Sequence, residues 1–397
     1  MTEPEAILWI GRMRFSPVIR IREVELARVI ARSRRVVALD RSDAPWDDPS
    51  PYGRIRHRLA LASGGWKTLP GDGVERFRMP VWMSNRSPGD RLAARLNERG
   101  VRRALAWFGC RRVFHSSPGF FLPPEKERGY RCHFDLVDNY LDHFPDTRYG
   151  RARRTFLLDQ LARADSLSTI SHHLCTRIEQ ELGRRPAYVP NGAAIEAIAS
   201  WPGERVQRLR ARPGFAGRRL LVYVGNHMAS FDGMEMLLDG FLAARRRLPE
   251  LALLIVGPGA ARVTAPRGLG PGDGVHAIGP VPADEVWDYF HAADLGLLPF
   301  VVEPGTDACL PLKVLEFGAA GRPMLASPLA ELRRLALPHV RYAPHEAGAW
   351  GAALADEATY IPPDPATLAE AMRPFSWERA AAALIEAMEG PSASRGR

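Results

Sequence analysis

The sequence is short of the residues that would build a membrane span, a disulfide framework or a zinc site. No apolar run approaches the roughly 20 residues that cross a bilayer. The acidic N-terminus runs directly into an apolar segment, unlike a signal peptide. The cysteines are far apart and form no CxxC pair, which fits a reducing compartment: Cys110, Cys132, Cys175 and Cys309. We therefore expect a cytoplasmic protein without a transmembrane segment.

The common phosphate-binding and metal-binding signatures are missing as well. No GxGxxG or GxxxxGKS/T follows an expected strand, and HExxH is absent. There is no Asp-x-Asp pair to hold a divalent cation on a nucleotide diphosphate. A nucleotide diphosphate would have to be bound by helix N-termini, backbone amides and cationic side chains. The sequence predicts no bound metal and no cofactor.

Lysine is scarce although the chain is basic. The net charge is +9, and of 54 basic residues only three are lysines: Lys67, Lys126 and Lys313. The excess of positive charge favours an anionic partner: a phosphate-bearing substrate, an anionic membrane surface or nucleic acid. Solvated helix faces also account for the local arginine clusters. Because no aromatic and basic motif of the known nucleic-acid modules is present, we expect no nucleic-acid partner.

Lys313 begins a helical segment rich in glycine and alanine, and Glu316 follows on the same helix face. A lysine suits a diphosphate approached end-on, and a carboxylate can accept two hydrogen bonds from a ribose diol. The pair predicts a site for a nucleotide diphosphate; the alternative is an exposed lysine beside a core helix. Gly225 ends an expected strand and would let backbone amides approach a phosphate, although a simple tight turn explains it nearly as well.

Strand-like and helix-like segments alternate along the chain, which favours parallel sheets with helices on both faces. At 397 residues the chain exceeds one hydrophobic core, so we expect two domains. Residues 199–217, rich in Pro, Gly and Arg, form a candidate linker. The expected strands are residues 6–10, 35–39, 112–115, 133–137, 166–170, 219–224, 251–256, 275–278, 295–299 and 323–326. Ligands of open α/β sheets bind at the carboxyl ends of strands, so loops facing across a cleft should hold the site.

Several motifs occur in an order typical of one family. The segment Asn191-Gly192-Ala193 is similar to its "pNGvd" turn, residues 253–259 to "lvivGpG" and residues 292–300 to "aDvgllPf". Residues 311–317 match the nucleotide-sugar motif "PlKvxEy", and residues 375–379 resemble the closing "fsWerra" helix. Together they resemble glycosyltransferases of the GT-B fold, which has two Rossmann-like parallel-sheet domains facing across a cleft. The resemblance is closer to bacterial exopolysaccharide and cell-envelope enzymes, including the inverting xanthan glucuronosyltransferase.

The resemblance implies that Glu316 binds the ribose and Lys313 the diphosphate or the donor sugar. The remaining donor-binding residues implied in this way are Gly225, Asn226, Gly257, Pro311 and Leu312. We expect a nucleotide-diphosphate sugar as donor, a UDP-sugar first, bound without metal. The large retaining branch carries a second Glu eight residues before the ribose-binding one, and here that position is Ala308. The departure favours an inverting transfer.

An inverting transfer needs a general base to take the proton of the acceptor hydroxyl. Asp138 follows the expected strand 133–137, in a segment that resembles the family's "YdxxDd". His115, also at a strand end, is the rival base, and His172 at a helix start is a weaker one. Asp138 could equally be an ordinary cap.

Arginines near an expected helix entry are candidate acceptor-binding residues: Arg12, Arg20 and Arg22. A diphosphate-lipid or acidic sugar would be bound well by them, and a solvent-facing helix entry explains them equally well. We expect residues 1–198 to form an acceptor-binding Rossmann-like domain and residues 199–375 a nucleotide-sugar-binding one. Residues 376–397 should form a helix that crosses back to the first domain, followed by a tail.

The function expected from these features is transfer of a sugar from a nucleotide-diphosphate donor to a saccharide or lipid-linked saccharide acceptor. Such a protein would work in the cytoplasm, in peripheral contact with the anionic inner face of the cytoplasmic membrane. Two alternatives stay open. A nucleotide-sugar 2-epimerase on the same fold would epimerise the donor without an acceptor. A non-catalytic relative would bind nucleotide-sugar or membrane without turnover.

Overall fold

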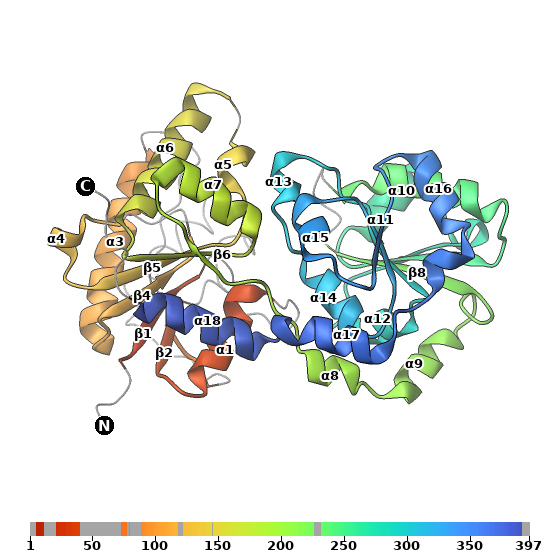
Figure 1. Ribbon diagram of the computed structural model, residues 1–397, viewed down its shortest axis with the longest axis horizontal. Helices are drawn as coiled ribbons and strands as arrows, with labels where there is room; N and C mark the ends of the chain where they lie inside the picture. Colours follow the sequence, from red (N-terminus) through yellow and green to blue (C-terminus); the bar gives the residue numbers. More distant parts are fainter. Residues whose placement is uncertain are drawn as a thin grey trace, which may run out of the picture. The chain divides into compact units, whose positions relative to one another are not determined.

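The computed structural model describes residues 5–11, 21–39, 73–77, 79, 89–117, 122–144, 146–225 and 232–390. It divides the chain into two compact units (Figure 1). Unit 1 contains the described residues up to Pro190 and the segment from Ala380 onward. Unit 2 contains Asn191–Arg379.

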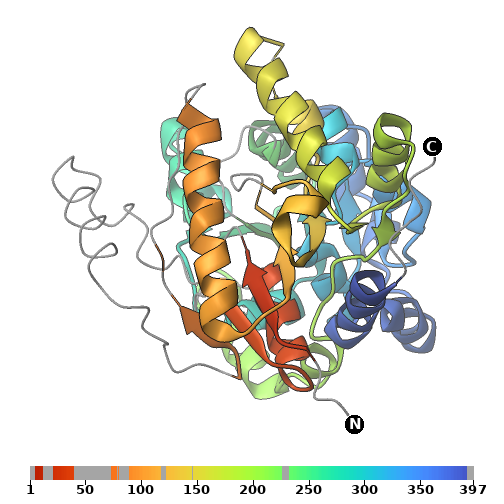
Figure 2. The same cartoon turned by 90° about the vertical axis from the view of Figure 1, so that its left-hand side faces the viewer.

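Unit 1 is built on a parallel sheet of seven strands in the order β3-β2-β1-β4-β5-β6-β7. Its helices cover both faces, with α6 and α7 on one side and α1 on the other (Figure 1). Figure 2 shows the 20-residue α3 beside the strands of this sheet. The strands are β1 Ile7–Ile10, β2 Val36–Leu39, β3 Glu75–Phe77, β4 Arg112–His115, β5 Arg131–Leu136, β6 Ser166–Thr169 and β7 Ala187–Tyr188. The helices are α1 Arg22–Ala31, α3 Gly89–Phe108, α4 Glu125–Arg128, α5 Tyr140–His143, α6 Arg148–Arg163 and α7 His172–Leu182.

Unit 2 repeats the plan with a parallel sheet of six strands in the order β10-β9-β8-β11-β12-β13. The strands are β8 Arg219–Val224, β9 Leu251–Val256, β10 Val275–Ile278, β11 Leu295–Leu298, β12 Met324–Ala326 and β13 Val340–Tyr342. The α-helices are α8 Ile195–Ala199, α9 Gly203–Arg210, α10 Met234–Arg245, α11 Ala260–Thr264, α12 Val286–Ala292, α13 Pro304–Asp307, α14 Leu312–Ala319, α15 Ala330–Leu335, α16 Ala347–Leu354 and α17 Pro365–Met372. Short 3₁₀ turns are η2 Ala265–Arg267, η3 Pro271–Asp273, η4 Glu357–Tyr360 and η5 Arg373–Phe375.

The core of unit 2 fixes the helix that carries the candidate donor residues. β9 is apolar along its whole length and fully buried, as expected for a central parallel strand. A Cβ atom at Gly296 of β11 would lie 2.7 Å from the ring of Phe317, so the glycine lets α14 pack directly on the sheet. Phe317 also makes an edge contact with Phe290 of α12, with ring centroids 4.7 Å apart. The position of α14 over β11 therefore depends on close packing.

The segment after Pro190 is tied to unit 2 by polar contacts. Asn191 Nδ2 donates to the carbonyl of Leu310 over 2.6 Å, and the backbone N–H of Ala193 donates to Phe375 over 2.8 Å. Residues 191–198 therefore cluster with unit 2, ahead of the linker expected from composition.

The closing helix, α18 (Trp377–Glu389), begins in unit 2 and ends in unit 1. Arg34 forms an ion pair with Glu389 at 2.5 Å, and Arg112 Nη1 donates to the carbonyl of Met388 over 2.9 Å. These contacts hold the end of α18 on unit 1.

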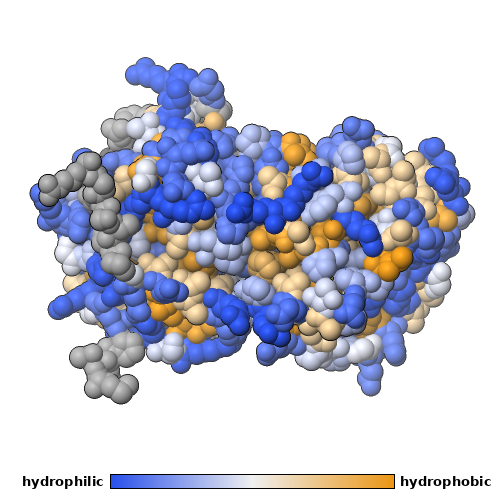
Figure 3. All heavy atoms as spheres, in the orientation of Figure 1, coloured by the Kyte–Doolittle hydropathy of each residue, from blue (hydrophilic) through white to orange (hydrophobic). Residues whose placement is uncertain are grey.

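Within the described part of the chain, no helix is both long and apolar enough to cross a bilayer. On the face shown in Figure 3, hydrophilic residues are interspersed with smaller apolar groups.

Candidate functional site

Lys313 lies in the first turn of α14, two residues after the N-cap Pro311. Its ammonium is 4.2 Å from the ring centroid of Tyr223 and 5.1 Å from that of Phe300. A Cβ atom at Gly225 would lie 2.8 Å from Nζ of Lys313. Tyr223 and Gly225 are at the carboxyl end of β8, and Phe300 follows β11. The ammonium therefore sits at the carboxyl ends of the two central strands, where open α/β sheets bind ligands.

The surroundings of Lys313 favour its neutral form more than water does. Burial lowers the pKa of Lys313 to about 8, and the carboxylates of Asp232 and Glu316 offset part of this effect. Burial also raises the pKa of Tyr223, whose hydroxyl donates to Oδ1 of Asp232 over 3.0 Å. An anionic ligand beside the ammonium would restore the charge balance that burial takes away. The arrangement is suited to a phosphate group.

Glycines let backbone segments approach each other closely at this end of the unit 2 sheet. Gly257, after β9, has a φ of 126°, and a Cβ atom there would lie 2.1 Å from the carbonyl oxygen of Gly225. Gly233 has a φ of 62°, and its Cβ would lie 1.8 Å from the carbonyl oxygen of Pro299. Side chains cannot be accommodated at either position without moving the backbone. The backbones of Gly225 and Gly257 therefore lie directly against each other at the ends of β8 and β9, and Gly225 adjoins Lys313.

The predicted donor-binding residues converge on this end of the unit 2 sheet. Glu316 is one turn after Lys313 on α14, is half-buried and acts electrostatically on the ammonium. Pro311 and Leu312 flank the helix start and are half-buried. Gly225 and Gly257 adjoin each other at the strand ends. Asn226 lies outside the described residues.

Three neighbours of Lys313 were not found from the sequence as parts of the site. Tyr223 and Phe300 are buried aromatic residues at strand ends, a pattern that the ordinary core also produces. Asp232 precedes α10, where an N-cap would stand, but the N-cap is Gly233 and the Asp232 carboxylate bonds to Tyr223 instead. No spacing in the sequence distinguishes these roles.

In unit 1 the two candidate bases, Asp138 and His115, differ in which of their side-chain atoms already accept hydrogen bonds. Asp138 follows β5, is half-buried, and its Oδ1 accepts the backbone N–H of Asn139 over 3.0 Å. His115 ends β4, is buried, and its Nδ1 accepts the backbone N–H of Ser117 over 3.2 Å. Nε2 must then carry the proton of the neutral ring, so His115 has no ring nitrogen left to accept one. Whether Asp138 or His115 is the general base stays a prediction.

The third candidate base, His172, begins α7 and stacks on Tyr188, with ring centroids 3.9 Å apart.

Arg22 is engaged inside unit 1. Its guanidinium donates to both carboxylate oxygens of Asp135, at 2.9 and 3.2 Å, and to the carbonyl of Pro190 at 2.6 Å. Arg22 and Asp135 are both buried. The side chain therefore ties α1 to β5 and to Pro190, after which the chain enters unit 2. The predicted contact of Arg22 with the acceptor stays a prediction. Arg12 and Arg20 lie outside the described residues.

A buried carboxylate, that of Glu23, lies at the carboxyl ends of β1 and β4 and was not singled out from the sequence. Glu23 of α1 accepts a hydrogen bond from the hydroxyl of Ser116, and a Cβ atom at Gly11 would lie 3.1 Å from its Oε2. Gly11 and Ser116 directly follow β1 and β4. Acidic residues are common in the first turn of a helix because they interact favourably with the helix dipole. The sequence therefore does not indicate that Glu23 is buried at the strand ends.

Among the described residues, no group of three or more His, Cys, Asp or Glu side chains is placed to hold a metal ion.

The two Rossmann-like units make this chain a GT-B protein, the fold class predicted from the sequence. The structure is similar to sucrose-phosphate synthase from Thermosynechococcus elongatus, with a TM-score of 0.70 and 15% identity over 96% of this chain and 98% of that one. It is also similar to Anabaena Alr3699/HepE in complex with UDP and glucose, with a TM-score of 0.67 and 15% identity over 96% and 99% of the two chains. At this identity the likeness concerns the fold.

Residues 218–374, which lie within unit 2, match the family model "Glycosyl transferases group 1". The chain is 28% identical over 187 residues to the putative teichuronic acid biosynthesis glycosyltransferase TuaH of Bacillus subtilis, covering 45% of this chain and 44% of that protein. It is 29% identical over 170 residues to the GDP-mannose-dependent alpha-(1-6)-phosphatidylinositol monomannoside mannosyltransferase of Mycolicibacterium smegmatis, covering 41% and 44% of the two. The alignments thus span less than half the length of these relatives. The narrower likeness to the xanthan enzyme stays a prediction.

Proposed function

We propose that this protein transfers a sugar from a nucleotide-diphosphate donor, bound by unit 2, to an acceptor bound by unit 1. The observation that carries the proposal is the position of Lys313. Its desolvated ammonium lies against the backbone at Gly225, at the carboxyl end of the sheet, with the Glu316 carboxylate one turn along the same helix. The match of residues 218–374 to group 1 glycosyltransferases supports the same assignment.

In this proposal Lys313 neutralises the diphosphate as the bond to the sugar breaks and negative charge develops on the leaving group. Glu316 accepts hydrogen bonds from the ribose hydroxyls. The backbone at Gly225 and Gly257 permits close approach of the phosphates. The donor is a UDP-sugar; Anabaena Alr3699/HepE, which has the same fold, is in complex with UDP and glucose. No step in the proposal needs a metal ion.

We place the general base at Asp138, which would take the proton of the acceptor hydroxyl during an inverting displacement. Ala308 stands where the retaining branch has its second Glu, and it is buried. A retaining transfer is the second candidate, because the mycobacterial relative forms an alpha-(1-6) linkage and group 1 enzymes are typically retaining. The anomeric configuration of the product, read from its NMR coupling constants, separates the two outcomes.

For the acceptor we propose a lipid-linked or polysaccharide precursor of the cell envelope. The relatives in teichuronic acid biosynthesis and in phosphatidylinositol mannoside synthesis support this class. The net charge of +9 would favour peripheral attachment to an anionic membrane at its cytoplasmic face.

The first test is a thermal-shift panel of UDP, GDP and TDP with their sugars on wild type and on Glu316→Gln. A ligand that binds only the folded state raises Tm in proportion to the logarithm of its concentration over Kd. We expect one nucleotide series to raise Tm in wild type and to lose most of that effect in Glu316→Gln. Glu370→Gln, an exposed carboxylate on α17, removes the same charge from unit 2 and should leave the shift intact. If no nucleotide raises Tm, the donor assignment is wrong.

The second test follows turnover with the identified donor and lipid-linked saccharides. Asp138→Asn should lower kcat by about 10²- to 10⁴-fold without losing donor binding, as expected for a general base. His115→Gln, in comparison, should fold less well but keep more of its kcat. An epimerised donor without acceptor would instead identify a 2-epimerase, and donor binding without any turnover a non-catalytic protein.

A further inference from the structure

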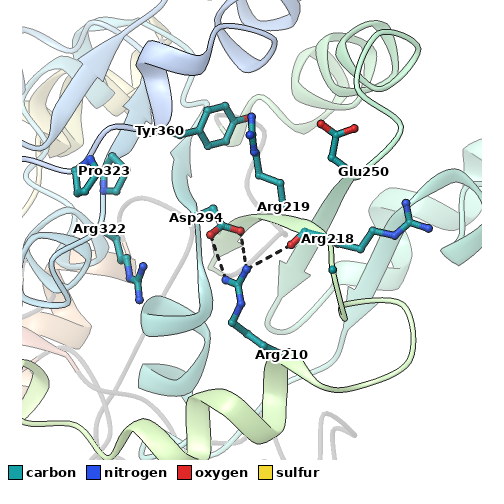
Figure 4. Close-up of a pocket in the computed structure, with 10 residues that line it drawn as sticks. Arg210, Arg218, Arg219, Glu250, Asp294, Arg322, Pro323 and Tyr360 are labelled. Atoms are coloured by element: carbon teal, nitrogen blue, oxygen red, sulfur yellow. Dashed lines mark hydrogen bonds and ion pairs between the residues drawn. The ribbon is translucent and has the colours of Figure 1, made fainter.

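An open pocket of about 530 Å³ lies at the other end of the unit 2 sheet, where the strands begin (Figure 4). Arg219 begins β8, Glu250 precedes β9, Asp294 precedes β11 and Arg322 and Pro323 precede β12. The pocket is lined by Arg210, Gly217, Arg218, Arg219, Glu250, Asp294, Arg322, Pro323, Tyr360 and Pro362. No residue of the candidate donor site belongs to it.

Two of its arginines are paired with carboxylates. Arg210 of α9 donates to Asp294 at 3.0 and 3.3 Å, and Asp294 also accepts the backbone N–H of Leu220 at 2.7 Å. Arg219 forms an ion pair with Glu357 at 2.7 Å and lies over the ring of Tyr360, 4.4 Å from its centroid. Asp294 is therefore already satisfied by three hydrogen bonds.

Arg322 has no such partner among the described residues. It is half-buried at the start of β12, and its Nε is buried without a hydrogen bond. Burial lowers the pKa of Arg322, the positive charge of Arg210 lowers it further, and only Asp294 opposes this. The carboxylate of Asp294 thus acts on both arginines, but of the two it forms hydrogen bonds only with Arg210 (Figure 4).

Arg218 is the fourth guanidinium of the lining and donates to a neutral group, the carbonyl of Pro249, at 2.9 Å. Four guanidinium charges thus face the three carboxylates of Asp294, Glu250 and Glu357. A half-buried guanidinium without a counter-ion is costly unless something neutralises it. An anion in the pocket would remove that cost.

We infer that this pocket binds a phosphate-bearing ligand, a phosphate monoester or diphosphate, through Arg322 together with Arg210 and Arg219. The planar guanidinium fork matches the oxygens of a phosphate, and two or three such groups can bind one ligand from different sides. The volume of the pocket, about 530 Å³, leaves room for the organic part of the ligand. The inference does not depend on the function proposed for the donor site.

The two phosphate sites would lie at opposite ends of the same strand and the same helix. The strand β8 carries Arg219 at its start and Gly225 after its end, which at about 3.3 Å per residue is roughly 20 Å. The helix α14 carries Lys313 in its first turn, and Arg322 follows its C-terminus. A ligand in the pocket would therefore not compete with a nucleotide at Lys313, but it would touch the ends of the same rigid elements.

The test is calorimetric titration with inorganic pyrophosphate in the Lys313→Met background, which silences the donor site. We expect one pyrophosphate to bind, with at least a tenfold loss of affinity when Arg322→Gln is added and partial recovery with Arg322→Lys. Arg341→Gln removes an exposed arginine of β13 and is the matched control. Equal affinity with and without Arg322→Gln, or no binding once Lys313 is replaced, would overturn the inference. Circular dichroism confirms that each variant is folded.

Phosphate groups occur both on soluble compounds and on lipids, and vesicle sedimentation distinguishes the two. Vesicles of phosphatidic acid in phosphatidylcholine present a phosphate monoester at a surface, whereas pyrophosphate is free to enter a recess. Sedimentation that needs Arg322 would assign the site to a headgroup. Sedimentation unchanged in Arg322→Gln, beside Arg322-dependent binding of pyrophosphate, would assign it to a soluble ligand.

Discussion

Replacing Lys313 by methionine should stabilise the protein while it abolishes donor binding. Methionine keeps the unbranched shape of the side chain but carries no charge into the space between Tyr223 and Phe300. In the free protein the ammonium is held there at the expense of its hydration, since burial lowers the pKa of Lys313. The residue would be kept for the ligand rather than for the fold.

The size of the effect follows from the pKa. A fall from 10.5 to about 8 is equivalent to about 3 kcal/mol of unfavourable free energy for the charged form, at roughly 1.4 kcal/mol per pH unit. Since methionine fills the site imperfectly, we expect a gain of about 1–3 kcal/mol at pH 7. For a unit of this size that is a rise in Tm of roughly 3–9 °C.

The pH dependence has a definite sign. The unfolded chain binds the proton of Lys313 more tightly than the folded one, so wild type gains stability as pH rises from about 8 to 10.5. The advantage of Lys313→Met should therefore be complete below pH 8 and shrink above it. Differential scanning fluorimetry at pH 7, 8.5 and 9.5, with and without nucleotide, measures both effects. Lys126→Met, at an exposed lysine, is the control. A lower Tm for Lys313→Met at pH 7, with a nucleotide shift equal to that of wild type, would refute the reasoning.

Two further predictions concern the same site, and a third concerns the buried ion pair of unit 1. Gly225→Ala should weaken nucleotide binding at least tenfold in calorimetry, because its Cβ would lie 2.8 Å from Nζ of Lys313 and 3.0 Å from the Tyr223 hydroxyl; unchanged affinity would mean that the loop moves freely. Nucleotide Kd should rise as pH increases through about 8, where free Lys313 loses its proton, and a Kd that is flat from pH 7 to 9.5 would exclude a charge contact. Asp135→Asn should destabilise unit 1 by about 3–5 kcal/mol in urea unfolding, because Arg22 would remain buried with its charge uncompensated; a loss under 1 kcal/mol would show that the pair contributes little.

The strands β8 to β12 of unit 2 could be predicted closely because they are largely apolar runs followed by glycine, proline or serine. β8, β9 and β10 have the predicted bounds, and β11 and β12 differ by one residue at an end. β3, β7 and β13 were not predicted. They have only two or three residues and are largely half-buried, so they lack the apolar run that marks a central strand.

The candidate site was predictable where chemistry and spacing are local. Lys313 and Glu316 are three residues apart on one helix, and a motif covers both. The ion pair of Arg22 with Asp135 joins positions 113 residues apart, and no local pattern announces it. No local pattern indicates the hydrogen bond between Asp232 and Tyr223 of the preceding strand either, although these two residues are closer in sequence. Tertiary packing decides whether such a residue caps a helix, binds a ligand or holds a neighbouring side chain in place.

The low pKa of Lys313 also makes it a nucleophile. An amine with a pKa of about 8 is roughly one-fifth neutral at pH 7.4, and a neutral lysine reacts with acylating reagents. In a chain with three lysines, few other amines compete for a reagent that can reach the strand ends. An activated ester carried on a nucleotide could therefore label the protein at this position, and free nucleotide would protect it. Because lysine is scarce, Lys313 would be a site for selective chemical labelling as well as a residue that binds the ligand.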